Sequence, residues 1–273
     1  MPEAVGKTIV ITGASSGIGR ELAVQLAAPG CEIWLVGRNQ ERLEQVAELT
    51  RAQGAIPRIV ELELSNLDGA GRFLTENFPH GKRVDAIYLA AAITAFGEVR
   101  NMLPEDWERI YQTNLLSPVQ WTHYFYSKMV EAKAGTIVIV SSLAAYSGYP
   151  TATAYATMKA GLLGLFRSLW YEGQSHGVEI HLASPGYVDT GIYRSAIYRK
   201  TSYDRTMSQI DGLGFKSISA PETAACIIRA VKRGNKEFAF PAYAAAMKWV
   251  APRMPFLINV VHSKIIKSFR KAS

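Results

Sequence analysis

The stretch Lys7-Thr-Ile-Val-Ile-Thr-Gly-Ala-Ser-Ser-Gly-Ile-Gly19 decides the fold of this chain of 273 residues. Its apolar, β-branched first half predicts a strand over residues 7–12, and a helix is expected to open directly after the turn. The turn residues are Gly13, Ser15, Ser16, Gly17, Ile18 and Gly19. Glycines let a ligand approach the backbone, and a helix N-terminus favours negative charge. The segment therefore predicts a strand, a turn that binds a pyrophosphate, and a helix.

The remainder of the chain repeats this order of an apolar strand followed by a longer helical pattern. Strands are expected over residues 7–12, 32–37, 58–64, 84–91, 135–141, 178–184 and 236–240. Helices are expected over residues 17–28, 39–53, 66–78, 104–133, 153–174 and 221–233. The apolar run at 137–140 does not alternate, which is typical of strands covered on both faces. The pattern predicts an α/β fold: one Rossmann-like domain over residues 1–241, with a parallel sheet of about seven strands and helices on both faces.

The segment Tyr155-Ala-Thr-Met-Lys159 predicts acid–base chemistry. On a helix, side chains four residues apart share a face, with roughly 5–6 Å between their Cβ atoms. A phenol has a pKa near 10, and a neighbouring ammonium favours its ionised form. Lowering that pKa to about 7 takes roughly 4 kcal/mol of differential stabilisation. In this hypothesis Lys159 and an oxidised nicotinamide supply that stabilisation together, which suits a general acid–base beside a redox cofactor.

Together with the glycine turn, this segment resembles the short-chain dehydrogenase/reductase family, and the resemblance runs from about Lys7 to about Pro241. It also rests on Asn114, on Ser142 and on the run Pro185-Gly-Tyr-Val-Asp-Thr190. The resemblance implies hydride transfer between NADPH and a ketone or alcohol.

The resemblance implies catalytic roles for four residues. Tyr155 donates a proton to the developing alkoxide, and Ser142 hydrogen-bonds the same oxygen and fixes its position. Lys159 lowers the pKa of Tyr155 and holds the nicotinamide ribose. Asn114 kinks a long helix and carries a water relay to Lys159. The offset of thirteen residues to Tyr155 favours Ser142 over its neighbour Ser141.

The end of the second predicted strand, Leu35-Val-Gly-Arg-Asn39, indicates NADP(H) as the cofactor. It has no carboxylate to hold a free ribose 2′-hydroxyl, and Arg38 offers a guanidinium that suits a 2′-phosphate. By resemblance, Glu63 and Leu64 lie beside the adenine, although the family usually has Asp where Glu63 stands.

Two further segments complete the expected cofactor site. Ala90 and Ala91 lie in Leu89-Ala-Ala-Ala92, where the family commonly has Asn-Asn-Ala-Gly. Small residues permit close approach of the cofactor, but the hydrogen bonds of an asparagine side chain are lost there. The nicotinamide pocket is expected from Pro185, Gly186, Val188 and Thr190.

Residues 190–219 interrupt the regular pattern of strands and helices. By resemblance they form a lid over the substrate, and the alternative is a pair of surface helices without a ligand role.

Five aromatic residues fit an apolar pocket with polar edges. They are Phe96, Tyr146, Tyr149, Tyr187 and Tyr193. We therefore expect an apolar or lipid-like ketone or alcohol as the substrate.

Residues 242–273 are expected to form a C-terminal extension rather than a separate domain, and residues 255–271 predict a basic amphipathic helix. Its apolar side is expected from Phe256, Leu257, Ile258, Val260, Val261, Ile265, Ile266 and Phe269. Such a helix suits contact with an anionic membrane surface, or packing on the body of the protein or on a second subunit. These interpretations stay open at the level of the sequence.

Composition excludes several other classes of protein. The net charge is +7, and the seven Lys/Arg and one Glu of residues 235–273 account for +6 of it, so no general nucleic-acid surface is indicated. Two cysteines and five scattered histidines give neither a disulfide framework nor metal-ligand spacing. The N-terminus lacks a signal-peptide pattern, and no apolar run reaches the roughly 18 residues of a membrane span. We expect a cytoplasmic protein, peripheral to the membrane if its last helix binds lipid.

Two expectations concern assembly and activity. By resemblance, the chain forms a homodimer or homotetramer through the helices expected at 104–133 and 153–174. The alternative to an enzyme is a catalytically silent NADPH-binding sensor or scaffold protein.

Overall fold

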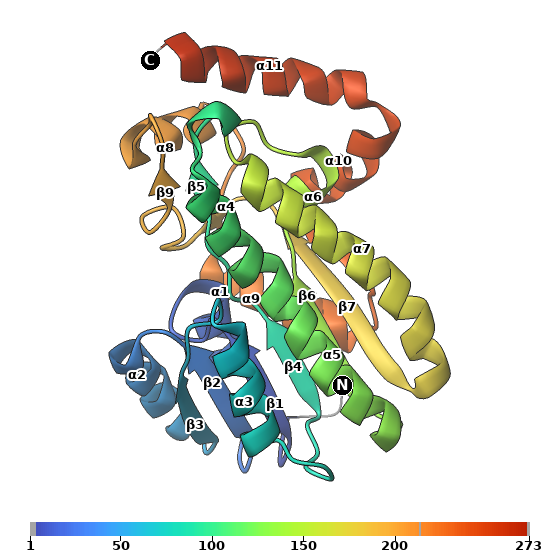
Figure 1. Cartoon of the computed structure of the whole chain (residues 1–273). Helices are drawn as coiled ribbons and strands as arrows, with labels where there is room; N and C mark the ends of the chain where they lie inside the picture. The colour runs from blue at the N-terminus through green and yellow to red at the C-terminus, as the bar shows by residue number, and fades with distance from the viewer. Residues whose placement is uncertain (1–3, 213, 272–273) are drawn as a thin grey trace.

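The computed structural model describes residues 4–212 and 214–271. A sheet of seven strands, all parallel to their neighbours, forms its framework in the order β11-β7-β6-β4-β1-β2-β3 (Figure 1). The strands are β1 (Thr8–Thr12), β2 (Glu32–Gly37), β3 (Ile56–Glu61), β4 (Ala86–Leu89), β6 (Gly135–Val140), β7 (Val178–Pro185) and β11 (Glu237–Phe240). The chain builds β1 to β3 in one direction and then places β4 on the other side of β1. In open α/β sheets, a reversal of this kind marks the place where ligands bind, at the carboxyl ends of the strands. The predicted α/β fold is confirmed.

Helices cover both faces of the sheet. One face packs against α1 (Gly17–Leu26), α2 (Gln40–Arg51) and α9 (Ala220–Lys232). The other packs against α3 (Leu67–Asn77), α5 (Ser117–Ala132) and α7 (Thr153–His176). The inner strands β1, β2, β4 and β6 are buried on both sides, which explains why their sequences are apolar without alternation, whereas the edge strand β3 is mostly exposed.

The helix expected over residues 104–133 is divided into three parts. It begins as α4 (Pro104–Tyr111), continues through the π-helical segment η2 (Gln112–Leu116) and ends as α5. Segments of π-helix inside longer helices occur frequently at functional sites. This one contains Asn114, the residue at which the resemblance implies a kink.

Two strands are shorter than expected, which changes the setting of four predicted cofactor residues. β3 ends at Glu61 and β4 ends at Leu89. The pairs at 63–64 and 90–91 therefore lie in the segments that follow the strands, at the edge of the sheet where ligands of such folds bind.

The segment 190–219 contains α8 (Tyr203–Asp211) and short strands. β9 (Ile197–Tyr198) pairs with β5 (Ala95–Phe96), and β10 (Ile218–Ser219) pairs with β8 (Val188–Asp189).

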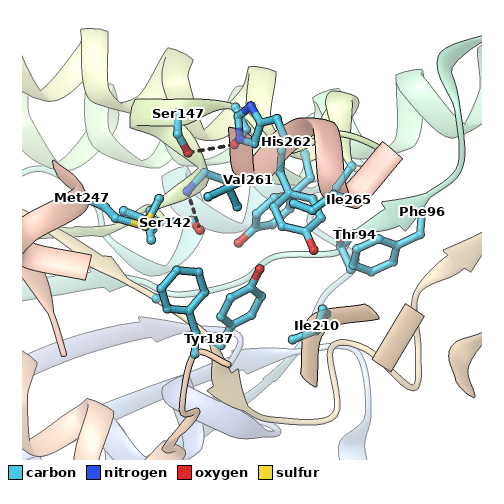
Figure 2. A pocket seen from close by; sticks show the side chains of 18 of the residues that line it. Thr94, Phe96, Ser142, Ser147, Tyr187, Ile210, Met247, Val261, His262 and Ile265 are labelled. Atoms are coloured by element: carbon cyan, nitrogen blue, oxygen red, sulfur yellow. Dashed lines mark hydrogen bonds between the residues drawn. The ribbon is translucent and has the colours of Figure 1, made fainter. Parts of the chain in front are cut away.

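The other elements are η1 (Val99–Asn101), α6 (Ala144–Ser147), α10 (Ala242–Arg253) and α11 (Pro255–Lys271). Helix α11 lies across one end of the molecule, against α8 and α10 (Figure 1). Side chains of α8, α10 and α11 share one cavity with residues of the sheet domain (Figure 2).

The apolar residues of α11 do not form a single side. Ile258, Ile265 and Phe269 are buried against the protein, whereas Phe256 and Val260 are 60% and 57% exposed. The expected single apolar side is therefore wrong, because these residues spread around more of the helix than one contact stripe covers. Among the described helices, none is both long enough and apolar enough to cross a bilayer.

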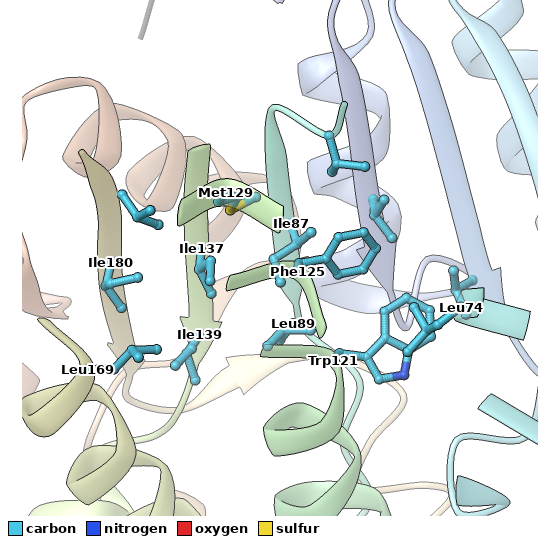
Figure 3. Close-up of a cluster of buried hydrophobic side chains, with 14 of the residues drawn as sticks. Leu74, Ile87, Leu89, Trp121, Phe125, Met129, Ile137, Ile139, Leu169 and Ile180 are labelled. Atoms are coloured by element: carbon cyan, nitrogen blue, oxygen red, sulfur yellow. The ribbon is translucent and has the colours of Figure 1, made fainter. Parts of the chain in front are cut away.

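The hydrophobic core lies in two layers, one on each side of the sheet. In the layer under α5, Trp121 and Phe125 are fully buried and lie against Ile87 and Leu89 of β4 (Figure 3). Large aromatic side chains of this kind dominate the energetics of a core. They fix α5 against the strand whose carboxyl end borders the candidate site.

Candidate active site

Four strands deliver most of the predicted site residues to one end of the sheet. β1 ends at Thr12, β4 at Leu89, β6 at Val140 and β7 at Pro185. Because the strands are parallel, their carboxyl ends meet at the same edge, and the segments that follow them come together there.

Tyr155 and Lys159 lie one turn apart near the start of α7. Lys159 is only 2% exposed; its Nζ lies 5.6 Å from the centre of the Tyr155 ring and donates a hydrogen bond to the carbonyl oxygen of Val140 at 2.9 Å. Burial lowers the pKa of the Lys159 ammonium from 10.5 to about 8, because the charged form loses its hydration. The predicted pair is thus brought together.

Burial also controls the hydroxyl of Tyr155. It raises the pKa of Tyr155 above the ordinary value of 10, and a side-chain hydrogen bond with Ser142 offsets part of that rise. Lys159 and a nicotinamide were expected to lower this pKa, but among the protein's own groups the loss of hydration is the larger effect. Tyr155 is therefore protonated at neutral pH, which is the form that donates a proton.

The two neighbouring serines have separate surroundings. Ser142 lines the cavity with Tyr155, and its Oγ accepts a hydrogen bond from the backbone nitrogen of Ala144 at 3.2 Å. Ser141 is buried, and its hydroxyl donates to the carbonyl oxygen of Lys159 at 3.0 Å. Ser142 therefore borders the cavity, while Ser141 holds the backbone of α7.

Asn114 is completely buried within η2. Its Oδ1 accepts a hydrogen bond from the backbone nitrogen of Ile93 at 2.9 Å, and its Nδ2 donates to the carbonyl oxygen of Ile93 at 2.7 Å. The side chain thus ties η2 to the segment that follows β4. The water relay to Lys159 stays a prediction.

The cavity beside Ser142 and Tyr155 has about 820 Å³ of empty space, its open mouth included. Four of the five aromatic residues expected there line it: Phe96, Tyr149, Tyr187 and Tyr193. The fifth, Tyr146, does not. Its hydroxyl lies 3.2 Å from the Ser184 hydroxyl and donates to Glu237 at 3.1 Å.

Several lining residues were not predicted. Besides the expected Tyr193, segment 190–219 contributes Ile192, Ile210 and Phe215, and the C-terminal extension contributes Met247, Val261, His262 and Ile265 (Figure 2). The only sequence signal for the second group was the amphipathic pattern at 255–271. That pattern identifies a helix with a packing face, but it does not say on what the face packs.

The glycine turn fits a dinucleotide pyrophosphate. Ser16, at the N-cap of α1, makes no side-chain cap hydrogen bond, and the first turn of α1 holds no acidic residue. Its first backbone N–H groups are therefore available to an anion. Gly13 has a φ of 73°, and a Cβ there would lie 2.8 Å from the Cα of Ala91. The backbone nitrogen of Ala91 donates to Oγ1 of Thr12 at 3.3 Å, which holds this segment where the family has asparagine.

The segment 185–190 lies beside the glycine turn. A Cβ at Gly17 would lie 3.2 Å from Cγ2 of Thr190, and Gly186 packs against the ring of Tyr243. Val188 is buried within β8. The residues expected at the pyrophosphate and those expected at the nicotinamide thus border one site.

Arg38 and Glu63 meet at the outer end of this site. Nη1 of Arg38 lies 3.3 Å from Oε2 of Glu63, and the two side chains are 48% and 43% exposed. Leu64, which follows Glu63 in the sequence, is buried. Of the two residues expected beside the adenine, Glu63 is therefore paired with the guanidinium of Arg38.

Comparison with known proteins agrees with this fold. The protein-family model for short chain dehydrogenase matches residues 7–200. The chain is 29% identical over 261 residues to 11-beta-hydroxysteroid dehydrogenase-like 4A of Arabidopsis thaliana, covering 93% of this chain and 82% of the relative.

Solved structures share the fold. A short-chain dehydrogenase/reductase from Burkholderia phymatum, in complex with NAD, has a TM-score of 0.82 at 21% identity, with 94% of this chain and 97% of that chain covered. A short-chain dehydrogenase from Sphingobium yanoikuyae, in complex with NADPH, has a TM-score of 0.77 at 20% identity, with 92% and 94% covered. Since the family model matches well over half of the sequence, the chain belongs to the short-chain dehydrogenase family of oxidoreductases.

Proposed function

We propose that the protein catalyses the NADP(H)-dependent interconversion of a ketone and an alcohol, and that its substrate is apolar or lipid-like. The observation that carries this proposal is that Ser142 and Tyr155 line one largely apolar cavity, with Lys159 buried beside the Tyr155 ring. A carbonyl oxygen near both hydroxyls meets two O–H donors, which is the requirement for stabilising a developing alkoxide.

The chain's own residues carry out the proton transfer. The nicotinamide, when bound, supplies the hydride to the carbonyl carbon. The Tyr155 hydroxyl donates its proton to the carbonyl oxygen, and the Ser142 hydroxyl hydrogen-bonds the same oxygen. The Lys159 ammonium then stabilises the phenolate that Tyr155 becomes. Its hydrogen bond to the Val140 carbonyl holds that charge in position.

Arg38 supports NADP(H) as the cofactor. Its ion pair with Glu63 is about half exposed, and such pairs contribute only about 0–1 kcal/mol. A 2′-phosphate carries more charge than one carboxylate and offers the guanidinium several acceptor oxygens. Rearranging Arg38 towards that phosphate therefore costs little.

The cavity lining supports an apolar substrate, because most of its side chains are aliphatic or aromatic. The Arabidopsis thaliana relative is named as hydroxysteroid dehydrogenase-like, which agrees with a lipid-like alcohol or ketone.

The test follows NADPH absorbance with a panel of apolar ketones, for the wild type and for Tyr155→Phe. We expect turnover by the wild type and a loss of at least about 100-fold in kcat in the variant, since the proton donor is gone. Tyr171→Phe is the matched control, because Tyr171 lies on the same helix and is 69% exposed. Equal rates for wild type and Tyr155→Phe would refute the mechanism. NADPH binding without turnover of any ketone would favour the sensor or scaffold instead.

We also propose that the outer face of residues 255–271 contacts an anionic membrane surface. Its exposed apolar residues Phe256 and Val260 lie on the same helix as the exposed Lys264 and Lys267, a combination that suits the lipid interface. The positive charge gathered in residues 235–273 complements anionic lipid.

Sedimentation with phosphatidylserine vesicles tests the membrane contact. Val260→Glu should reduce the bound fraction, whereas Ser268→Glu, at another exposed position of α11, should reduce it less. Unchanged sedimentation of Val260→Glu would contradict the contact, and a loss of dimer in that variant would identify a second copy as the partner. The cytoplasmic location and the homodimer or homotetramer stay predictions.

A further inference from the structure

Helix α11 forms part of the wall of the catalytic cavity. Val261, His262 and Ile265 line the same space as Ser142 and Tyr155. The C-terminal extension therefore takes part in enclosing the substrate.

Contacts on both sides hold α11 in this position. Ile258 and Ile265 are buried. The guanidinium of Arg205 in α8 donates a hydrogen bond to the carbonyl oxygen of Phe269, and Nε of Arg270 donates to Glu98 at 2.8 Å. Side chains of α11 can thus act as fixed elements of the substrate site rather than as a loose cover.

His262 is the polar residue among the four that the C-terminal extension contributes to the wall; the others are Met247, Val261 and Ile265. Ser147 of α6 also lines this part of the wall (Figure 2). In the described residues, neither ring nitrogen of His262 has a hydrogen-bond or ion-pair partner. The side chain is only partly buried, so water can reach the ring while the cavity is empty. A wholly apolar ligand that displaces this water leaves the imidazole without a partner, which costs free energy, whereas a ligand atom that hydrogen-bonds the imidazole avoids that cost.

The ring of His262 is suited to an uncharged partner. Burial lowers the pKa of His262 below its ordinary value of 6.5, so the imidazole is neutral at pH 7. A neutral imidazole has one N–H donor and one acceptor nitrogen. A hydroxyl can use either, whereas a carboxylate would have to enter apolar surroundings with its charge uncompensated.

His262 also lines a second cavity that shares a wall with the first. This cavity lies between α6, α7 and α11, and Ser147, Gly148 and Tyr149 line both. Its other lining residues include the small side chains Ala145, Ala156 and Ala160. His262 therefore stands between the catalytic cavity and a second, more open space, where the remainder of an elongated substrate has room.

We infer that His262 is a specificity-determining residue, and that the substrate is an elongated apolar ketone or alcohol with a second, uncharged hydrogen-bonding group that contacts the imidazole. This inference rests on the proposed function, which accounts for the reacting carbonyl of the substrate. It adds a second hydrogen-bonding group of the substrate, which contacts His262.

The test uses straight-chain methyl ketones of increasing length, each with and without a terminal hydroxyl. At the length where the hydroxyl meets His262, the wild type should have a KM about 10-fold lower for the hydroxylated ketone, the value of one good hydrogen bond. His262→Leu should bring the two KM values within about twofold of each other. His262→Gln should restore part of the preference, since its amide can donate and accept. Ser263→Ala, at an exposed position of α11, should keep the wild-type preference.

Equilibrium binding of the same ketones to Tyr155→Phe, loaded with NADPH, separates this inference from the proposed function. A hydroxyl preference in Kd that disappears in Tyr155→Phe/His262→Leu supports the role of His262 even if no ketone is turned over. Turnover of the ketones with no hydroxyl preference at any length, or with a preference that His262→Leu retains, would overturn the inference and leave the oxidoreductase intact.

Discussion

The phenolic oxygen of Tyr243 lies 2.7 Å from the backbone nitrogen of Tyr187 and accepts its hydrogen bond. Tyr243 belongs to α10 in the C-terminal extension, whereas Tyr187 follows β7 in the segment expected at the nicotinamide. The Tyr243 ring also stacks on Phe215 of segment 190–219, with 4.8 Å between ring centres. Three regions far apart in the sequence therefore meet at this point. The extension therefore contacts the segment expected at the nicotinamide as well as lining the cavity.

Tyr243→Phe should weaken cofactor binding. The substitution keeps the ring but leaves the Tyr187 N–H without its acceptor, at a cost of about 1–2 kcal/mol. We expect the Kd for NADPH to rise about tenfold, measured by the change in NADPH fluorescence on binding. Tyr171→Phe, at an exposed position, is the control. An unchanged Kd would show that this hydrogen bond does not position the segment 185–190 for the cofactor.

Much of this site can be predicted from sequence because its determinants are local. The spacing of Tyr155 and Lys159 becomes a shared helix face in any α-helix. A glycine turn between a strand and a helix produces an anion site wherever that unit forms. Ser142 reaches the pair because it follows directly after β6, whose end is hydrogen-bonded to α7 through Lys159 and the Val140 carbonyl.

The contributions of the C-terminal extension could not be predicted in the same way. Tyr243 and His262 lie in helices whose own sequences fit several packing partners. What brings them to the site is the docking of α10 and α11 on elements distant in sequence, such as Arg270 on Glu98. Burial raises the pKa of Tyr155 in the protein alone, which the spacing could not foretell, because it reveals the attraction of a tyrosine and a lysine but not the depth of their burial. The lowering of this pKa by Lys159 together with a nicotinamide stays a prediction.

Arg38→Asp should reverse the cofactor preference. A carboxylate after β2 repels a 2′-phosphate and can accept a hydrogen bond from a free 2′-hydroxyl. We expect kcat/KM to fall about 100-fold with NADPH, the value of a lost charge-assisted interaction, and to rise with NADH. Arg51→Asp, an exposed change at the far end of α2, should leave the ratio of the two cofactors unchanged. An Arg38→Asp enzyme that still prefers NADPH would refute the role of Arg38.

Asn114→Ala should destabilise the protein. Asn114 is completely buried and makes both of its hydrogen bonds to the backbone of Ile93. Removing the amide leaves the N–H and the C=O of the half-buried Ile93 unpaired, which lowers the free energy of unfolding by about 1–3 kcal/mol. Urea denaturation measures this loss, with His123→Ala at an exposed position of α5 as the control. A loss below about 0.5 kcal/mol would mean that water replaces the amide in both bonds.

Lys159 should make stability depend on pH in the alkaline range. Its folded-state pKa of about 8 lies below the ordinary value of 10.5, so between these values the unfolded chain binds more protons at this residue than the folded chain does. The free energy of unfolding therefore rises with pH across this window, by roughly 3 kcal/mol in total.

Subtraction of Lys159→Met isolates this effect from the titration of tyrosines. In urea denaturation between pH 8 and pH 10.5, the stability of the wild type relative to Lys159→Met should increase as the pH rises. Below pH 8 the difference should be constant, because the buried ammonium is then charged in both states. A difference that stays flat or falls between pH 8 and pH 10.5 would show that Lys159 keeps an ordinary pKa. Its burial would then be compensated by a charge or dipole beyond the Val140 carbonyl.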